Sequence, residues 1–165
     1  MMTDADAREG EIALDVPPLA DDAGIAFIGH IASSWKNRSE CPRNIRQARE
    51  RGGWSRLCVA APFRPALNGL AVGQPIVVLY WLGEARRDLI MQRPRHRETA
   101  TGTFNLRSPV RPNPIGLAVT TIRSLDALEG VLEIDPLDCV DGTALLDIKP
   151  WLESIDLPHG FTPAG

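Results

Sequence analysis

Six short apolar stretches, separated by glycine, proline and aspartate residues, constrain most strongly what this chain can fold into. Each stretch is rich in leucine or β-branched residues, which are common in strands, and each is bounded by residues typical of turns. Short strands with turns between them favour a barrel or a sandwich over a sheet of alternating strands and helices. The expected strands are residues 24–32, 54–61, 75–82, 115–123, 130–135 and 143–148.

Helical signals are sparse in the same sequence. Residues 45–51 predict a short helix, because two glycines directly after them end the segment. Residues 84–91 predict a second one. A chain of 165 residues suits one domain, and its 14 glycines and 14 prolines lie largely between the expected strands. We therefore predict a mainly β protein, a single small β-barrel domain with short helices and long loops.

The chain is expected to have three parts. Residues 1–23 are acidic and lack periodicity, which predicts a flexible leader; residues 24–157 form the barrel domain, and residues 158–165 form a tail. The leader has no apolar signal core, and no apolar run approaches the roughly 20 residues of a membrane span. We expect no secretory or transit peptide and no membrane association.

The formal net charge of −3 conceals an uneven distribution. Residues 1–35 contain seven acids and one arginine, residues 36–111 contain fifteen basic and five acidic residues, and residues 112–165 contain nine acidic and two basic residues. Arginine makes up 16 of the 18 basic residues, and its planar guanidinium suits phosphates and carboxylates. The basic middle segment either contacts a nucleic acid or pairs with the acidic C-terminal third, and both interpretations stay open.

Several classes of site are not expected. The three cysteines and three histidines have no metal-ligand or disulfide spacing, so we expect no metal and a reducing, cytoplasmic location. The sequence contains no GxGxxG, GxxxxGK[ST] or GxSxG motif, which argues against a Rossmann, P-loop or α/β-hydrolase site.

The most unusual segment is 101–117, TGTFNLRSPVRPNPIGL. Its three closely spaced prolines restrict the backbone, so the loop is stiff before any ligand arrives. Arg107 and Arg111 lie four residues apart on it, and Gly116 permits close approach of a backbone. A preorganised loop with two arginines indicates a binding loop, although a proline-rich barrel corner is the alternative.

A second segment, 135–151, contains acidic residues beside a turn signal. Asp138 and Asp141 could accept hydrogen bonds from a ligand, or they could cap the Asp141-Gly142 turn, which for Asp141 is the favoured interpretation. Lys149 could pair with Asp147 across the strand end.

A third segment, 92–97, has the sequence QRPRHR. If it is extended, its three arginines lie on one side and could face phosphates, and the alternative is a solvated loop. The arginines are Arg93, Arg95 and Arg97.

Two of these segments resemble the signature of the TrmO-type, or TsaA-like, family. The residues are GTF, RSP and RPNPIG within 102–116, and D-x-x-D-G-T-x-x-x-D-I-K-P-W at 138–151. The resemblance covers about residues 24–157. It implies a small β-barrel that uses S-adenosylmethionine to methylate N6 of threonylcarbamoyladenosine at position 37 of tRNA, and it implies a homodimer.

The resemblance also implies which residues bind the cofactor. Asn44 departs from the family's Gln, and Trp81 and Leu82 stand where some members have His-Gln. The implied cofactor contacts are Pro42, Arg43, Asn44, Trp81, Leu82, Arg107, Leu117, Asp135, Pro136, Leu137 and Asp138.

For catalysis, Asp138 is the candidate base or orienting acceptor and Asp141 is the next candidate. Contacts to tRNA phosphates are expected from Arg93, Arg95, Arg97 and Arg111. The alternative function is an S-adenosylmethionine-binding protein of another role, either a methyltransferase with a different acceptor or a non-catalytic regulator or sensor. The altered Trp81-Leu82 pair, and the expectation that the chain lacks the extra C-terminal domain of longer members, slightly favour the non-catalytic regulator or sensor.

Overall fold

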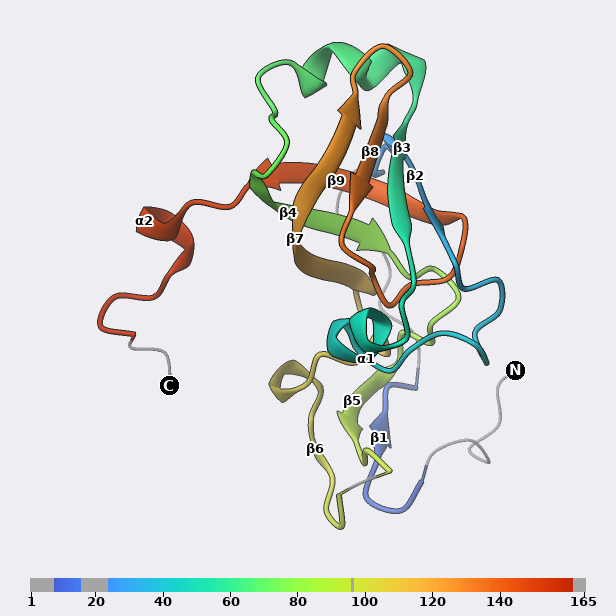
Figure 1. Cartoon of the computed structure of the whole chain (residues 1–165). Coiled ribbons are helices and arrows are strands. Elements are labelled where there is room, and N and C mark those ends of the chain that lie inside the picture. The colour runs from blue at the N-terminus through green and yellow to red at the C-terminus, as the bar shows by residue number, and fades with distance from the viewer. Residues whose placement is uncertain (1–7, 16–23, 96, 162–165) are drawn as a thin grey trace. The chain divides into compact units, whose positions relative to one another are not determined.

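Six strands form a closed barrel in the computed structural model, which describes residues 8–15, 24–95 and 97–161 (Figure 1). Their order around the barrel is β2-β3-β8-β7-β4-β9. Each of the six apolar stretches supplies one strand, so the predicted mainly β barrel is confirmed. The bounds are β2 Gly29–Ser33, β3 Ser55–Val59, β4 Pro75–Trp81, β7 Ile115–Asp126, β8 Val131–Ile134 and β9 Thr143–Pro150. The first strand therefore begins later than predicted, and β7 and β9 end later.

Alternation along the strands fills the barrel. On β7, Ala118, Thr120 and Ile122 are buried, whereas Leu117 before them and Val119 between them are exposed. The same alternation on the other strands places branched aliphatic side chains inside, where removing their apolar surface from water stabilises the fold. The fully buried aliphatic residues of the strands are Ile31, Leu57, Ile76, Val78, Ala118, Ile122, Leu132 and Leu145.

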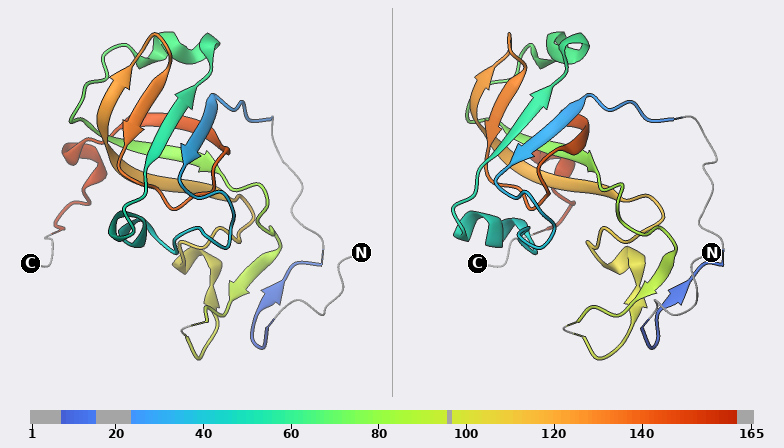
Figure 2. Two further views of the ribbon diagram at one scale, coloured as in Figure 1. Left: turned by 45° about the vertical axis from the view of Figure 1, so that its right-hand side comes forward. Right: turned by 90° about the vertical axis from the view of Figure 1, so that its right-hand side faces the viewer.

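The chain divides into two compact units, each described separately below. The barrel unit is Ile25–Trp81 with Leu117–Gly165, and the insert unit is Met1–Gly24 with Leu82–Gly116. Outside the strands, the barrel unit contains α1 Ile45–Glu50, the 3₁₀ helix η2 Ala61–Leu67 and α2 Glu153–Asp156. The insert unit contains a three-stranded sheet in the order β1-β5-β6 and a 3₁₀ turn (Figure 2). Its elements are β1 Ile12–Ala13, β5 Leu89–Gln92, β6 Thr101–Gly102 and η3 Thr103–Asn105.

One of the two predicted helices is confirmed and one is wrong. α1 occupies the predicted segment 45–51, but within 84–91 the chain makes turns and then enters β5. Leu89 is buried, and β5 has β1 on one side and β6 on the other. Pairing on both edges overrides a local preference for helix that was weak over so few residues.

Part of the expected leader is described. Residues 12–13 form β1, which pairs antiparallel with β5, and the backbone N–H of Leu14 donates to the carbonyl of Asp88 at 2.8 Å. Residues 1–7 and 16–23 of the expected leader, and 162–165 of the expected tail, lie outside the described residues.

Gly29 illustrates how closely the barrel strands approach. A Cβ at this position would meet the backbone carbonyl of Cys58 on β3, whereas a Cβ at Gly24 would meet nothing within 4 Å. We expect Gly29→Ala to lower the free energy of unfolding by about 1–3 kcal/mol, the usual cost of overpacking a core. Urea denaturation measures this change. Gly24→Ala is the matched control, and equal stability of the two variants would contradict the prediction.

Candidate functional site

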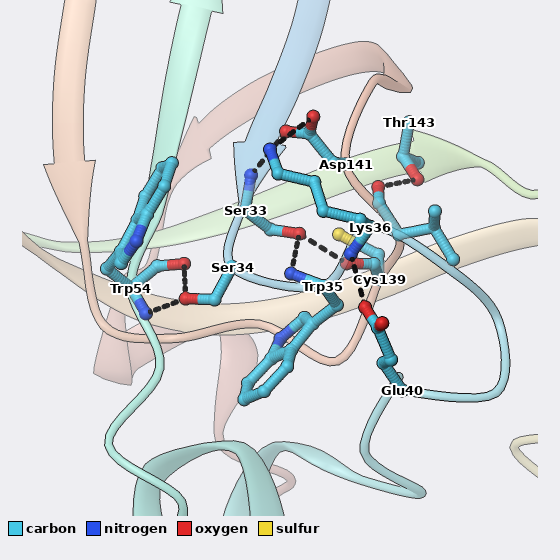
Figure 3. A network of polar contacts seen from close by, with 10 residues as sticks. Ser33, Ser34, Trp35, Lys36, Glu40, Trp54, Cys139, Asp141 and Thr143 are labelled. Carbon is cyan, nitrogen blue, oxygen red and sulfur yellow. Dashed lines mark hydrogen bonds and ion pairs between the residues drawn. The ribbon is translucent and has the colours of Figure 1, made fainter.

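Two loops meet at the end of β2 through a buried polar network (Figure 3). The side chain of Ser33 is fully buried; its Oγ donates to the carbonyl of Cys139 at 2.9 Å and accepts from the backbone N–H of Trp35 at 3.2 Å. The backbone N–H of Ser33 donates to Oδ1 of Asp141 at 2.9 Å. Because buried polar groups are costly unless they are paired, these bonds hold the loop after β2 against the segment before β9.

The same two loops are joined further along the chain. Trp35 Nε1 donates to the carbonyl of Leu137 at 2.8 Å, and Cys41 Sγ donates to the carbonyl of Asp138 at 2.9 Å. The backbone N–H of Leu137 donates to Oγ of Ser55 at 3.0 Å. The structure therefore places two groups of expected cofactor residues, 42–44 and 135–138, in neighbouring loops of the barrel unit.

Asp141 is held by the fold. Its carboxylate accepts from the Lys36 ammonium at 2.8 Å and from the Ser33 backbone, and these bonds, that of Lys36 first, hold its pKa below the usual aspartate value. A carboxylate with a lowered pKa is a weak base. These contacts favour a structural role for Asp141 and leave Asp138, which is half-buried, as the stronger catalytic candidate.

Asn44 has a local structural function that accounts for its residue type. Its side chain is the N-cap of α1 and accepts from the backbone N–H of Gln47 at 2.9 Å. Gln47 Oε1 in turn accepts from the backbone N–H of Arg43 at 2.7 Å. Asparagine is among the preferred N-cap residues, so this position suits the cap. The bonds order the loop and leave the Arg43 side chain exposed.

Thiol chemistry is not available at this end of the barrel. Burial, with a smaller contribution from the Asp138 carboxylate, raises the pKa of Cys41 to about 11 and that of Cys139 to about 12. Both thiols are therefore protonated at neutral pH and are poor nucleophiles.

Among residues 8–15, 24–95 and 97–161, no three His, Cys, Asp or Glu side chains are grouped as metal ligands. No helix in these ranges is long and apolar enough to cross a membrane.

The remaining expected cofactor residues belong to both units. Trp81 ends β4 and is half-buried, and Leu117 lies on the outer face of β7, 42% exposed. Leu82 and the exposed Arg107 belong to the insert unit. Asp135 pairs with Arg123 at 2.7 Å in the barrel unit. Within the barrel unit the structure thus positions apolar, acidic and basic groups on neighbouring elements.

The insert unit contains a shallow cavity of about 340 Å³ that is open to solvent and lined mainly by arginines. Arg93, Arg95 and Arg97 come from segment 92–97. The backbone N–H of Arg97 donates to the carbonyl of Pro94 at 2.9 Å, so the segment makes a turn and the expected extended ladder is wrong. The lining residues are Arg8, Arg93, Pro94, Arg95 and Arg97.

Arg8 escaped prediction because nothing in the acidic sequence around it marks a site. Its guanidinium donates to the carbonyl of Arg93 at 2.8 Å, and pairing of β1 with β5 brings it there.

Arg111, expected to contact phosphate, donates from Nη2 to the carbonyl of Leu106 at 2.8 Å and to that of Thr103 at 3.1 Å. Arg111 therefore supports its own loop.

Comparison with known proteins identifies relatives across most of the chain. Residues 30–157 match the model of the tRNA-methyltransferase O N-terminal domain. The probable S-adenosyl-L-methionine-binding protein VirR of Rhizobium radiobacter is 38% identical over 143 residues, 87% of this chain and 78% of VirR. The tRNA (adenine(37)-N6)-methyltransferase of Mus musculus is 38% identical over 72 residues, 44% of this chain and 16% of that protein.

Solved structures give the same picture. The crystal structure of TrmO from Pseudomonas aeruginosa superposes with a TM-score of 0.64 at 25% identity, covering 86% of this chain and 61% of that one. The chain therefore spans less than two thirds of the length of this TrmO.

The pKa of Asp141 predicts a pH dependence of stability. Because the folded-state pKa lies below the unfolded value of 3.8, the stability that this carboxylate contributes is present above that pH and is lost as the pH falls through the lowered pKa. Asp141→Asn is expected to lower the free energy of unfolding at neutral pH by about 1–2 kcal/mol and to weaken its acid dependence. Urea denaturation across a pH series measures both quantities.

Asp147→Asn is the matched control, because Asp147 pairs with Lys149 at 2.8 Å on the exposed end of β9. Its effect is expected to be smaller. Equal losses in the two variants would contradict the structural role of Asp141.

Proposed function

The chain belongs to the TrmO family, and from that membership we propose that it is an S-adenosylmethionine-dependent methyltransferase acting on tRNA. The observation that supports this most is the match of residues 30–157, which includes both signature segments and the loops that meet beside Asp138. The proposed acceptor is N6 of an adenine, as in the name of the mouse relative, and more narrowly the threonylcarbamoyladenosine at position 37.

Several groups on the barrel unit have the chemistry that is needed to bind S-adenosylmethionine. Trp81 and Leu117 offer apolar surface of the kind that receives an adenine ring, and the 135–138 segment offers carboxylate and carbonyl oxygens for an ammonium or sulfonium. The family resemblance implies that Arg107 is the partner of the cofactor's carboxylate. When bound, this cofactor supplies a methyl group activated by the positive sulfur.

The chain's own residues must position the acceptor and remove a proton. Transfer of a methyl group is a displacement, so much of the rate depends on holding the two reactants in line. The N6 lone pair of an adenine is delocalised, and nitrogen must lose a proton as it attacks. We assign the role of proton acceptor to Asp138, whose backbone carbonyl accepts from the Cys41 thiol. Asp141 keeps a structural role through its bonds with Ser33 and Lys36.

The proposed contacts to tRNA lie on the insert unit. Arg93, Arg95 and Arg97 share a cavity with Arg8, and gathered guanidinium groups suit phosphates. Glu9 also reaches Arg93, at 3.4 Å, so part of this positive charge is balanced inside the unit.

We further propose that the protein is a homodimer and that it is located in the cytoplasm.

A second candidate function is binding of the same cofactor without methyl transfer to tRNA. It is favoured by VirR, which matches more of this chain than the mouse methyltransferase does. Incubation of the purified protein with labelled S-adenosylmethionine and tRNA separates the two. Label in the tRNA adenine supports the methyltransferase, and cofactor binding without label in any tRNA pool supports the second candidate.

Arg107 provides a direct test of cofactor binding. Because a charged hydrogen bond is lost, we expect Arg107→Ala to weaken S-adenosylmethionine binding at least about tenfold in calorimetry. Arg46→Ala is the control, since Arg46 is exposed on α1 and pairs with Glu50. Unchanged affinity in Arg107→Ala, with a native melting profile, would remove Arg107 from the site.

Arg95 provides a test of tRNA binding. Removing one phosphate contact is expected to weaken binding at low salt and to reduce the slope of log affinity against log salt by about 1. Filter binding of tRNA by Arg95→Ala across a salt series measures the slope, with Arg46→Ala again as the control. A slope equal to that of the wild type would exclude Arg95 from phosphate contact.

A further inference from the structure

Phe104 presents an aromatic ring to solvent from a well-anchored turn. It is the middle residue of η3, and its side chain is 87% exposed. Single exposed apolar residues are ordinary on protein surfaces, so exposure by itself assigns nothing. The anchoring of the turn on either side of Phe104 distinguishes this ring from one on a loose loop.

The first anchor is Thr103, which is 2% exposed. Its hydroxyl donates to the carbonyl of Leu89 at 2.8 Å and accepts from Nε2 of Gln92 at 2.9 Å. Gln92 is also buried, and its Nε2 donates to the carbonyl of Val110. These bonds tie the start of η3 to β5, which lies beside it (Figure 2).

The second anchor is Arg111. Its Nη2 donates to the carbonyls of Thr103 and Leu106, which flank the turn on either side of Phe104. Its Nε is buried and has no hydrogen-bond partner within the described part of the chain. A guanidinium in this position holds the backbone of the turn, so little further ordering is needed when the ring of Phe104 meets a ligand.

The charge of the insert unit indicates what the ring meets. The same unit contains the cavity lined by four arginines. A ligand that matches both features has negative charges and flat apolar faces in one molecule. Single-stranded RNA has this combination, because its phosphates bind arginine and its unpaired bases stack on aromatic side chains.

We propose that Phe104 is a stacking platform for an unpaired base of the RNA substrate, while the arginine cavity holds the phosphate backbone. This inference rests on the proposed function, since it takes the substrate to be RNA. Arg111 is then a positioning residue, which acts through the turn and not through phosphate.

Binding of a fluorescein-labelled anticodon stem-loop RNA to the full chain tests the proposal. Loss of one stacked base is expected to weaken binding about tenfold in Phe104→Ala. The slope of log affinity against log salt is expected to stay as in the wild type, because stacking neutralises no phosphate. Phe104→Trp, which keeps a stacking surface, is expected to retain affinity. Calorimetry with S-adenosylmethionine alone checks that each variant keeps its cofactor site.

The matched control is Leu128→Ala, because Leu128 is also 87% exposed but lies in the turn between β7 and β8 of the barrel unit. RNA binding by this variant is expected to equal that of the wild type. Equal affinity of Phe104→Ala and wild type overturns the stacking proposal alone, whereas no RNA binding by the wild type overturns the proposed function with it. Loss of a dimer in light scattering, with RNA affinity unchanged, also overturns it by assigning the ring to a contact between subunits.

Discussion

The hydrogen bonds of Ser33 at the end of β2 are the constraint on which the candidate site depends. Ser33 is fully buried, and its hydroxyl and backbone N–H together join the loop after β2 to Cys139 and Asp141. Trp35 and Cys41 continue the same junction to Leu137 and Asp138. Pairing of β2 with β9 and of β3 with β8 brings the two loops to one end of the barrel, although about ninety residues separate 42–44 from 135–138 in sequence. The hydrogen bonds of the junction then fix one loop against the other. The cost of leaving any of these buried groups unpaired keeps the arrangement unique.

The net charge of −3 hides how differently the basic side chains are placed in the fold. Several cations of the basic middle segment pair with the acidic C-terminal third: Lys36 with Asp141, Arg56 with Glu133 and, at 3.9 Å, Arg49 with Asp135. This is the structural alternative that the sequence left open. Four arginines of the insert unit, Arg8, Arg93, Arg95 and Arg97, instead line a cavity, and Glu9 partly balances their charge. The structural interpretation therefore applies to Lys36, Arg49 and Arg56, and nucleic-acid contact is a proposal for the arginines around the cavity.

The family and the barrel were predictable because their signals are local and repeated. Each strand shows β-branched or leucine-rich residues between turn formers, and the family expected from the motifs in 102–116 and 138–151 is confirmed by the match over 30–157. The helix at 84–91 was wrong because β5 is stabilised by its partners and not by its own sequence. The three arginines at 93–97 line one cavity, and their geometry depends on a turn hydrogen bond that alternation does not predict; their contact with tRNA stays a prediction.

By itself, the sequence determined the fold class, the strand segments and the family, since hydrophobic alternation, turn chemistry and long motifs are properties of neighbouring residues. Only the tertiary structure decided what individual side chains do. It directed Asp141 to Lys36 and Ser33, Asn44 to the cap of α1, and Arg111 to the turn that displays Phe104. The reason is physical: a carboxylate, amide or guanidinium can satisfy its hydrogen bonds with ligand or with backbone, and the choice depends on which groups the folded chain brings within reach.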